Sequence, residues 1–326
     1  MENLMFSMAR RRILLGATAF AVGTVAAFSA AAQDVTKLRI SIQPIIDLTP
    51  LFIAQKFGYF AEEGLEVDTS PTSGAATGIP GLIGGAYDIT FGAAVSSLLA
   101  FSQGLEIEVI SPGTQMIRKP SPSLIVGKRD DSWATPADFV GKSIAVNTRN
   151  SIVWLYAQAW VEARGAKIED VVFREVGFPQ MGDAIIQDQV DAAFMVEPFK
   201  GAALQDPGLV VIGDPFAEAQ PGADAGNYVT TKAFAAEHPQ VIAKFRNAIR
   251  RAVDWYNANR TTDENYKIIS GFTNLPVETL KKIDLPEFPL ISNKGELTAT
   301  AELMVRYGMI EAVPDIEAYV NPIATK

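Results

Sequence analysis

The sequence predicts an α/β protein with two similarly built lobes, each a mostly parallel sheet flanked by helices. After Gln33, short β-rich runs alternate with segments of helical spacing. Strands separated by one helix each favour right-handed βαβ crossovers and parallel pairing. The same alternation starts again near residue 123, which favours two lobes over one large sheet.

The individual elements follow from apolar spacing and from glycine or proline at their ends. We expect strands at 38–42, 65–68, 87–91, 107–110, 123–126, 143–146, 171–176, 192–195 and 209–212. We expect helices at 50–63, 78–85, 94–103, 151–163 and 181–187, a linker or rim loop at 214–226, and a mostly helical remainder. Two apolar stripes support the helical remainder, one through Val241, Phe245, Ile249, Val253 and Tyr256 and one through Leu297, Ala301, Met304 and Tyr307.

One internal repeat supports the two-lobe reading. Leu82, Ile83, Asp88 and Phe91 recur as Ile185, Ile186, Asp191 and Phe194, at a constant offset of 103 residues. Each copy combines a helix end, a short turn and a buried strand, so we expect the two segments to occupy equivalent places.

The N-terminal segment has the order of a secretory signal. Three arginines, Arg10 to Arg12, precede an apolar stretch at 13–28, and alanines 30–32 offer a cleavage site before Gln33. The arginine pair followed by Ile13 and Leu14 is also compatible with the twin-arginine route. The apolar stretch is shorter than the roughly 20 residues of a spanning helix. We therefore expect a signal peptide at 1–32 and a periplasmic protein.

Composition excludes several classes of partner and site. Residues 1–32 carry a net charge of +2 and the whole chain −9, so the remainder carries −11. Such acidity disfavours nucleic acid and anionic membranes. The chain has no cysteine and one histidine, His238, which excludes disulfides, a lipid-anchor cysteine, thiol catalysis and the usual zinc clusters. We expect no metal, no cofactor and a monomer.

Four segments resemble a known family, in the same order along the chain. PLFIAQKFGYFAEEGLEV (residues 50–67), GGAYDITFGA, DFVGKSIAV and QVDAAFMVEPF are similar to the nitrate-, sulfonate- and taurine-binding proteins of ABC importers, a group that includes thiamine-pyrimidine binders. The resemblance covers residues 37–260. The first segment also has a local reading, in which Thr49 caps a helix and Pro50 occupies its first turn.

The resemblance implies a bilobal periplasmic-binding-protein fold of type II with a two-strand hinge and a ligand cleft between the lobes. We place the first part of lobe 1 at 33–119, lobe 2 at 120–228, and the second part of lobe 1 with the C-terminal helices at 229–326. The implied partners are a small molecule and an ABC permease with its cytoplasmic ATPase.

In parallel α/β sheets, ligands bind outside the carboxyl ends of the strands. That rule selects the segments 43–49, 70–76, 92–95, 147–151, 177–181 and 197–199. The candidate ligand-binding residues are Gln43, Asp47, Thr49, Ser73, Gly74, Ala93, Arg149, Asn150, Ser151, Phe178, Gln180 and Glu197.

The ligand class stays open at this point. Three expected helix starts, at residues 73–75, 92–94 and 149–151, suit an anionic group, and Arg149 adds a cation. If Asp47 and Glu197 face the cleft, a zwitterion or a polar heterocycle fits better than nitrate. The alternative readings are an ordinary N-cap for Ser73, Asn150 and Ser151, a solvent-facing cation for Arg149, a turn residue for Asp47, and a helix-starting carboxylate for Glu197.

Catalytic motifs are missing from the sequence. There is no G-x-S-x-G elbow and no S-x-x-K. The motif GKS at 141–143 is followed by an expected strand, whereas a phosphate-binding loop requires a helix there. We therefore expect a binding protein for import. The alternatives are a binding protein that serves a chemoreceptor, and a carboxylate-based hydrolase that uses Asp47 and Glu197.

Overall fold

The computed structural model describes residues 35–72, 74–117 and 119–326. The expected signal peptide at 1–32 and the candidate residue Ser73 lie outside this part of the chain. Among the described residues, every helix is too short or too polar to cross a membrane.

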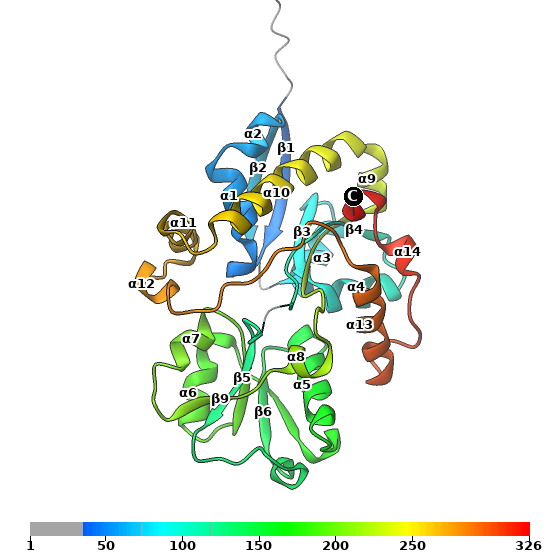
Figure 1. Cartoon of the computed structure of the whole chain (residues 1–326). Coiled ribbons are helices and arrows are strands. Elements are labelled where there is room, and N and C mark those ends of the chain that lie inside the picture. The colour runs from blue at the N-terminus through cyan, green and yellow to red at the C-terminus, as the bar shows by residue number, and fades with distance from the viewer. Residues whose placement is uncertain (1–34, 73, 118) are drawn as a thin grey trace, which may run out of the picture. The chain divides into compact units, whose positions relative to one another are not determined.

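Ten strands form two five-stranded sheets (Figure 1). The first sheet contains β1 (Thr36–Ile42), β2 (Leu65–Pro71), β3 (Ile89–Ala93), β4 (Ile107–Pro112) and β10 (Gly226–Thr231) in the order β2-β1-β3-β10-β4. The second contains β5 (Leu124–Lys128), β6 (Ser143–Val146), β7 (Val172–Glu175), β8 (Ala192–Met195) and β9 (Leu209–Gly213) in the order β7-β6-β8-β5-β9. Only β10 and β5 run antiparallel to their neighbours, so both sheets are mostly parallel, as predicted.

The longer helices of the chain are α1 (Thr49–Lys56), α3 (Ala75–Ile83), α4 (Ala94–Ser102), α5 (Ile152–Ala163), α10 (Pro239–Asn259), α11 (Asp263–Thr273) and α13 (Lys294–Arg306). The shorter ones are α2 (Tyr59–Glu62), α6 (Met181–Ile186), α7 (Phe199–Ala203), α8 (Pro215–Ala219), α9 (Lys232–Glu237), α12 (Val277–Leu280) and α14 (Ile316–Tyr319). The described residues also form five 3-10 turns, at Ile46–Leu48, Pro136–Phe139, Ile168–Asp170, Phe178–Gln180 and Pro322–Thr325.

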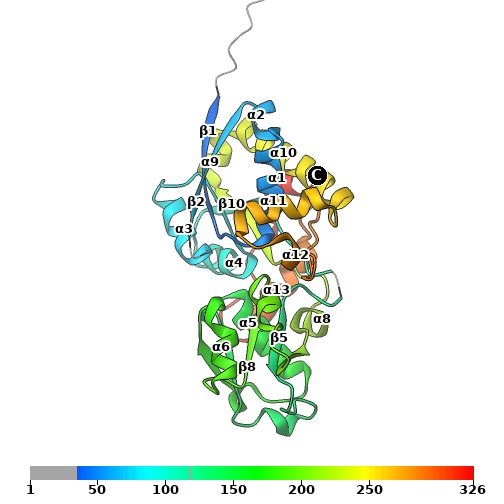
Figure 2. The same ribbon diagram turned by 90° about the vertical axis from the view of Figure 1, so that its left-hand side faces the viewer.

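Helices cover both faces of each sheet because successive strand residues point to opposite faces. In β1, Leu38, Ile40 and Ile42 pack against α1 and α10, while α3 and α4 cover the other face. In the second sheet, Ile144 and Val146 face α5, whereas Ala145 faces α6. We call each sheet with its helices a lobe. Figure 2 shows α5, α6, β5 and β8 grouped in the second lobe.

The sequence repeat marks equivalent positions in the two lobes. Asp88 precedes β3, and its carboxylate accepts the backbone N–H of Arg39, 2.8 Å away. Asp191 precedes β8 and accepts the backbone N–H of Ser143, also at 2.8 Å. In both lobes this aspartate also binds a cation, Arg39 in one and Lys142 in the other. The predicted repeat is therefore a structural one.

Three local expectations were wrong. The segment expected as one helix at 50–63 is two helices, α1 and α2, separated at Gly58, whose φ of 72° is the left-handed region that glycine tolerates. Thr49 does not cap α1; it is the first helical residue, and its hydroxyl donates to the carbonyl of Ile46. The stretch 214–226, expected as a loop, contains α8, which is capped by the Asp214 side chain.

The lobes are connected by two crossings of the chain that pair with each other. The first crossing follows β4 and the second precedes β10. Met116 donates its N–H to Ala223 and accepts the N–H of Gly222, and Thr114 accepts the N–H of Ala225 at 2.8 Å. We call residues 113–116 and 222–226 the hinge. The expected lobe boundary at 228/229 falls inside β10; the division of the chain at residues 120 and 228 remains a proposal.

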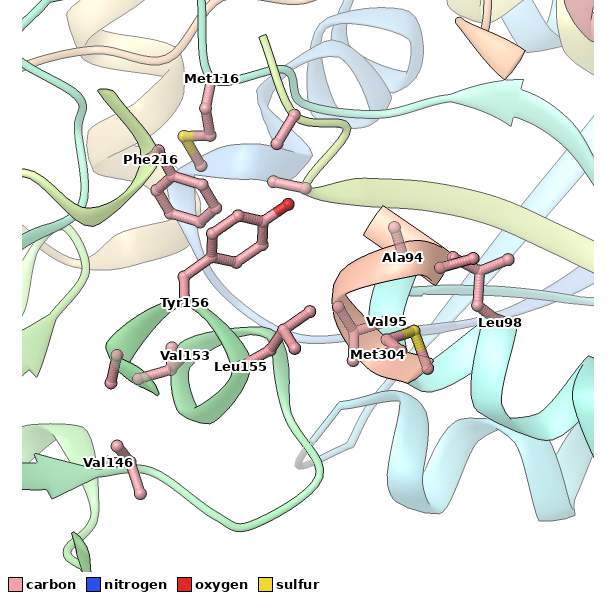
Figure 3. Packing of buried hydrophobic residues seen from close by; sticks show 14 of the residues in the cluster. Ala94, Val95, Leu98, Met116, Val146, Val153, Leu155, Tyr156, Phe216 and Met304 are labelled. Atoms are coloured by element: carbon pink, nitrogen blue, oxygen red, sulfur yellow. The ribbon is translucent and has the colours of Figure 1, made fainter. Parts of the chain in front are cut away.

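Beside the hinge, side chains from both lobes form one buried cluster. Figure 3 shows Tyr156 and Phe216 of the second lobe next to Met116, with α4 residues and Met304 of α13 in the same cluster. The Tyr156 hydroxyl donates to Gln220 at 2.8 Å, and the amide of Gln220 donates to Glu296 on α13 at 2.9 Å.

Asp224 is the most unusual group of this region. Its side chain is 1% exposed, Oδ2 accepts the N–H of Asn293, and Oδ1 is buried without a hydrogen-bond partner among the described residues. Burial, with a smaller contribution from the charge of Glu296, raises the pKa of Asp224 to about 7. Below about pH 7 the folded chain therefore favours the protonated carboxyl.

This raised pKa predicts a loss of stability with increasing pH. Between about pH 4 and about pH 7 the folded state holds a proton that the unfolded state has released, so the free energy of unfolding falls across this window. Asp224→Asn should remove this fall and raise stability at pH 8 by up to about 4 kcal/mol. Urea unfolding at pH 5 and pH 8 measures it, with exposed Asp130→Asn as control. Parallel pH profiles of wild type and Asp224→Asn would contradict the assignment.

Candidate functional site

A cavity lies where the carboxyl ends of strands from both lobes meet the hinge. Its volume of about 830 Å³ includes space open to solvent. The lining residues are Gln43, Ile45, Asp47, Gly74, Ala75, Phe91, Ala93, Ser96, Met116, Ser123, Asn147, Thr148, Ser151, Ile152, Val153, Phe178, Val196, Phe216, Ala225 and Gly226. Six of the predicted site residues are among them: Gln43, Asp47, Gly74, Ala93, Ser151 and Phe178.

Backbone geometry at Gly74 places the side chain of Gln43 at the cavity. Gly74 has a φ of 121°, and a Cβ there would lie 3.2 Å from Oε1 of Gln43. Glycine thus satisfies both the positive φ and the close approach. Gln43 follows β1 directly, so its amide can donate to or accept from a ligand at the strand's carboxyl end.

Asp47 is the carboxylate of the cavity wall. It lies in the 3-10 turn before α1, and the hydroxyl of Thr114 in the hinge donates to its Oδ1 at 2.7 Å. Burial raises the pKa of Asp47, and the hydrogen bond from Thr114 partly offsets this effect. Its carboxylate adds to burial in raising the pKa of Tyr228.

The second lobe contributes a polar helix start and an aromatic ring. Ser151 caps α5 by accepting the N–H of Trp154 at 3.2 Å, and its own hydroxyl is within 3.0 Å of Oδ1 of Asn147. Phe178 follows β7 and stacks on Phe199, with ring centroids 5.9 Å apart. The second lobe therefore contributes the aromatic ring of Phe178 and the hydrogen-bonding groups of Asn147 and Ser151 to the cavity wall.

Three helix starts converge on the cavity, as the sequence predicted: those of α3, α4 and α5. Two of them already direct N–H groups at protein acceptors. Ala94 donates to the carbonyl of Ala225, and Trp154 donates to Ser151. Because these N–H groups already have acceptors, fewer donors remain for an anion than at helix starts without such hydrogen bonds.

The charge of the wall is one-sided. Among the described lining residues, Asp47 is the only ionisable side chain, and no lysine or arginine contributes. Within the same described residues, no group of three or more histidine, aspartate or glutamate side chains is placed to hold a metal ion.

The other described candidates lie off the cavity wall. Thr49 is fully buried in α1. Arg149 is exposed; its backbone N–H donates to Oε1 of Glu175 at 2.8 Å, and its carbonyl accepts the hydroxyl of Thr148 at 3.4 Å. Asn150 is exposed with a φ of 57°, a left-handed turn that asparagine tolerates before α5. Gln180 is exposed in the 3-10 turn before α6.

Glu197 has a structural partner instead. Its side chain is 1% exposed, and its Oε1 lies 3.0 Å from Nζ of Lys200, whose side chain is 3% exposed. Its Oε2 accepts the N–H of Gly201 at 3.0 Å. Burial raises the pKa of Glu197, and the ion pair with Lys200 opposes that rise. This arrangement matches the reading of Glu197 as a helix-starting carboxylate.

Some missed lining residues, such as Ile45, Asn147 and Thr148, lie in segments that the strand-end rule selects, but others come from places that it does not select. Met116, Ala225 and Gly226 belong to the hinge, Ser123 directly precedes β5, and Phe216 lies in α8, within the stretch expected as a loop. A Cβ on Gly226 would lie 2.7 Å from the ring of Phe91 and 3.1 Å from Oγ1 of Thr114, so glycine permits the tight packing there. In the sequence, the glycine and alanine content of 222–226 is the feature that could have indicated these hinge residues.

The chain belongs to the family described as NMT1/THI5 like, which matches residues 45–261. It is 28% identical to the riboflavin-binding protein RibY of Chloroflexus aurantiacus, with 89% of this chain and 85% of the relative covered. It is 25% identical to the formylaminopyrimidine-binding protein of Halalkalibacterium halodurans, covering 76% of this chain and 70% of that protein.

Among solved structures, the periplasmic aliphatic sulphonate binding protein SsuA of Escherichia coli has the same fold, with a TM-score of 0.72 and 17% identity. The match covers 87% of this chain and 97% of SsuA. The predicted resemblance and the predicted bilobal periplasmic-binding-protein fold are thereby confirmed.

The position of Glu197 predicts an effect on folding. Glu197→Gln leaves the buried Lys200 with a single carboxylate partner, so the free energy of unfolding should fall by about 3 kcal/mol. Arg149→Ala, at an exposed position, should change it by no more than about 0.5 kcal/mol. Urea titrations of both variants give these values. Unchanged stability of Glu197→Gln would show that the ion pair does not support the fold.

Proposed function

We propose that this chain is the solute-binding component of an ABC importer and that its ligand is a neutral or cationic nitrogen heterocycle with N–H donors. The single observation that carries the ligand class is the cavity's lone charge, the Asp47 carboxylate, with no cation among the described lining residues. The implied partners are a permease with its ATPase, and we propose that the chain acts as a monomer.

Electrostatics disfavours a small anion in this cavity. A nitrate or sulfonate group would approach the Asp47 carboxylate without a compensating lysine or arginine among the described lining residues. An N–H donor would instead form a charge-assisted hydrogen bond, which is stronger than a neutral one. This reasoning selects the heterocyclic alternative that the sequence left open.

The remaining wall suits a flat polar ring. Phe91, Phe178 and Phe216 offer aromatic faces or edges, and the amides of Gln43 and Asn147 can pair with ring carbonyls and nitrogens. Pockets with apolar walls and a few placed polar groups are typical of small-molecule sites. The two relatives whose names include riboflavin and formylaminopyrimidine support the same ligand class.

The positions of Asp47 and Glu197 argue against the alternative of a hydrolase that uses both carboxylates. Its two carboxylates would need to act on one substrate, but only Asp47 lines the cavity, and Glu197 is engaged by Lys200. We propose binding without catalysis.

Calorimetry with riboflavin, formylaminopyrimidine, an aliphatic sulfonate and nitrate tests the ligand class. At least one heterocycle should bind, and Asp47→Asn should weaken it roughly 10- to 100-fold, the value of a charge-assisted hydrogen bond. Arg149→Ala is the matched control and should bind normally. In wild type the affinity should fall as acid protonates Asp47, whose pKa is raised by burial. Preferential binding of the sulfonate or nitrate would contradict the proposal.

We also propose export to the periplasm with cleavage after Ala32. N-terminal sequencing of the exported protein should begin at Gln33, because alanines 30–32 provide the cleavage site. Replacing Arg11 and Arg12 with lysine should block export only if the twin-arginine route is used. A full-length chain retained in the membrane would contradict cleavage.

A further inference from the structure

A buried lysine joins the two lobes at a point outside the cavity wall. Lys200 lies on α7 of the second lobe, and its Nζ contacts two carboxylates, Glu197 at 3.0 Å and Asp284 at 3.1 Å. The Lys200 side chain is 3% exposed, that of Glu197 1% and that of Asp284 33%. We call Glu197, Lys200 and Asp284 the interlobe triad.

Asp284 belongs to the first lobe by its packing. It follows α12, and its neighbours Ile283 and Leu285 belong to an apolar cluster with Ile46, which precedes α1. The same cluster contains Ile269 of α11, and α11 packs on α1. Figure 1 shows α12 beside α7 at the left of the view. The bond between Lys200 and Asp284 therefore crosses from one lobe to the other.

Close packing around the triad fixes the approach of the two lobes. Gly201 follows Lys200, and a Cβ at this position would lie 2.6 Å from Cγ2 of Ile283 and 3.0 Å from Oε2 of Glu197. Any larger residue would push α7 away from the segment after α12. The lobes therefore meet here through an apolar contact, between Gly201 and Ile283, and an ion pair, between Lys200 and Asp284.

The two ion pairs of Lys200 have different consequences. The pair with Glu197 lies within the second lobe and persists when the lobes separate. The pair with Asp284 forms only when the lobes meet, and separation replaces it with water. Any free energy that the pair between Lys200 and Asp284 contributes therefore favours the closed arrangement of the lobes. None of the three triad residues is among the described lining residues of the cavity.

We infer that the ion pair between Lys200 and Asp284 is a closure latch, which raises the ratio of closed to open chains independently of what the cavity binds. Partly exposed ion pairs contribute little, so we expect the latch to change this ratio about fivefold. A protein with two narrow crossings can rotate about its hinge, and a contact between the lobes outside the cavity wall biases that rotation.

Distances between spin labels test the latch without any ligand. The chain has no cysteine, so Ala61→Cys on exposed α2 and Gln187→Cys after α6 give one labelled site on each lobe. Pulsed electron paramagnetic resonance on the labelled, ligand-free protein reports the fractions of short and long distances between the two spin labels. The variants are Asp284→Asn, the charge-preserving Asp284→Glu, and Asp263→Asn as control. Asp263 pairs with Lys281, and neither residue lies in the second lobe.

Asp284→Asn should lower the ratio of short to long distances about fivefold. Asp284→Glu should recover most of the wild-type ratio, and Asp263→Asn should leave it unchanged. Thermal unfolding checks that each variant is folded. A wild-type distribution with only long distances, or the same distribution in wild type and Asp284→Asn, would overturn the latch. Because no ligand is present, neither result bears on the proposed ligand class.

Discussion

The pairing of β10 between β3 and β4 is the constraint on which the rest of the structure depends. The chain completes the whole second lobe before β10 returns, antiparallel, to fill the gap in the first sheet. This return forces two neighbouring crossings, and their backbone hydrogen bonds at Thr114 and Met116 make the hinge. Apart from β10 and β5, the strands of each sheet run parallel to one another. Their carboxyl ends therefore lie at the edge near the hinge, and the cavity forms there.

The hinge also takes part in the site itself. Thr114 donates its hydroxyl to Asp47, so the cavity's carboxylate is held by a residue of the crossing rather than by its own lobe core. Helix starts that could have served an anion are partly occupied, one by Ser151 and one by the carbonyl of Ala225. The described cavity wall therefore combines a single ionisable side chain, Asp47, with neutral amides and aromatic rings.

Two groups of charged residues outside the cavity wall lie where the two lobes meet. The triad of Glu197, Lys200 and Asp284 connects them on one side, and the buried Asp224 lies within the hinge beside Glu296. Buried charges are costly unless paired, so Glu197 depends on its partner Lys200, and the raised pKa of Asp224 makes the stability of the fold depend on pH. The described cavity wall includes hinge residues such as Met116 and Gly226 but none of the triad.

The sequence by itself determined the alternation of strands and helices, the repeat at Asp88 and Asp191, and the loops that reach the cavity. These features are local or periodic, and parallel strands place their carboxyl ends at one edge whatever packs around them. Only the tertiary structure decided which way the side chains of those loops point. Glu197 turns to Lys200 because a buried carboxylate needs a cation, whereas Arg149 is exposed, next to the left-handed residue Asn150. The hinge residues at the cavity, such as Met116 and Gly226, also required the fold, because their place depends on pairing between segments about 110 residues apart in sequence.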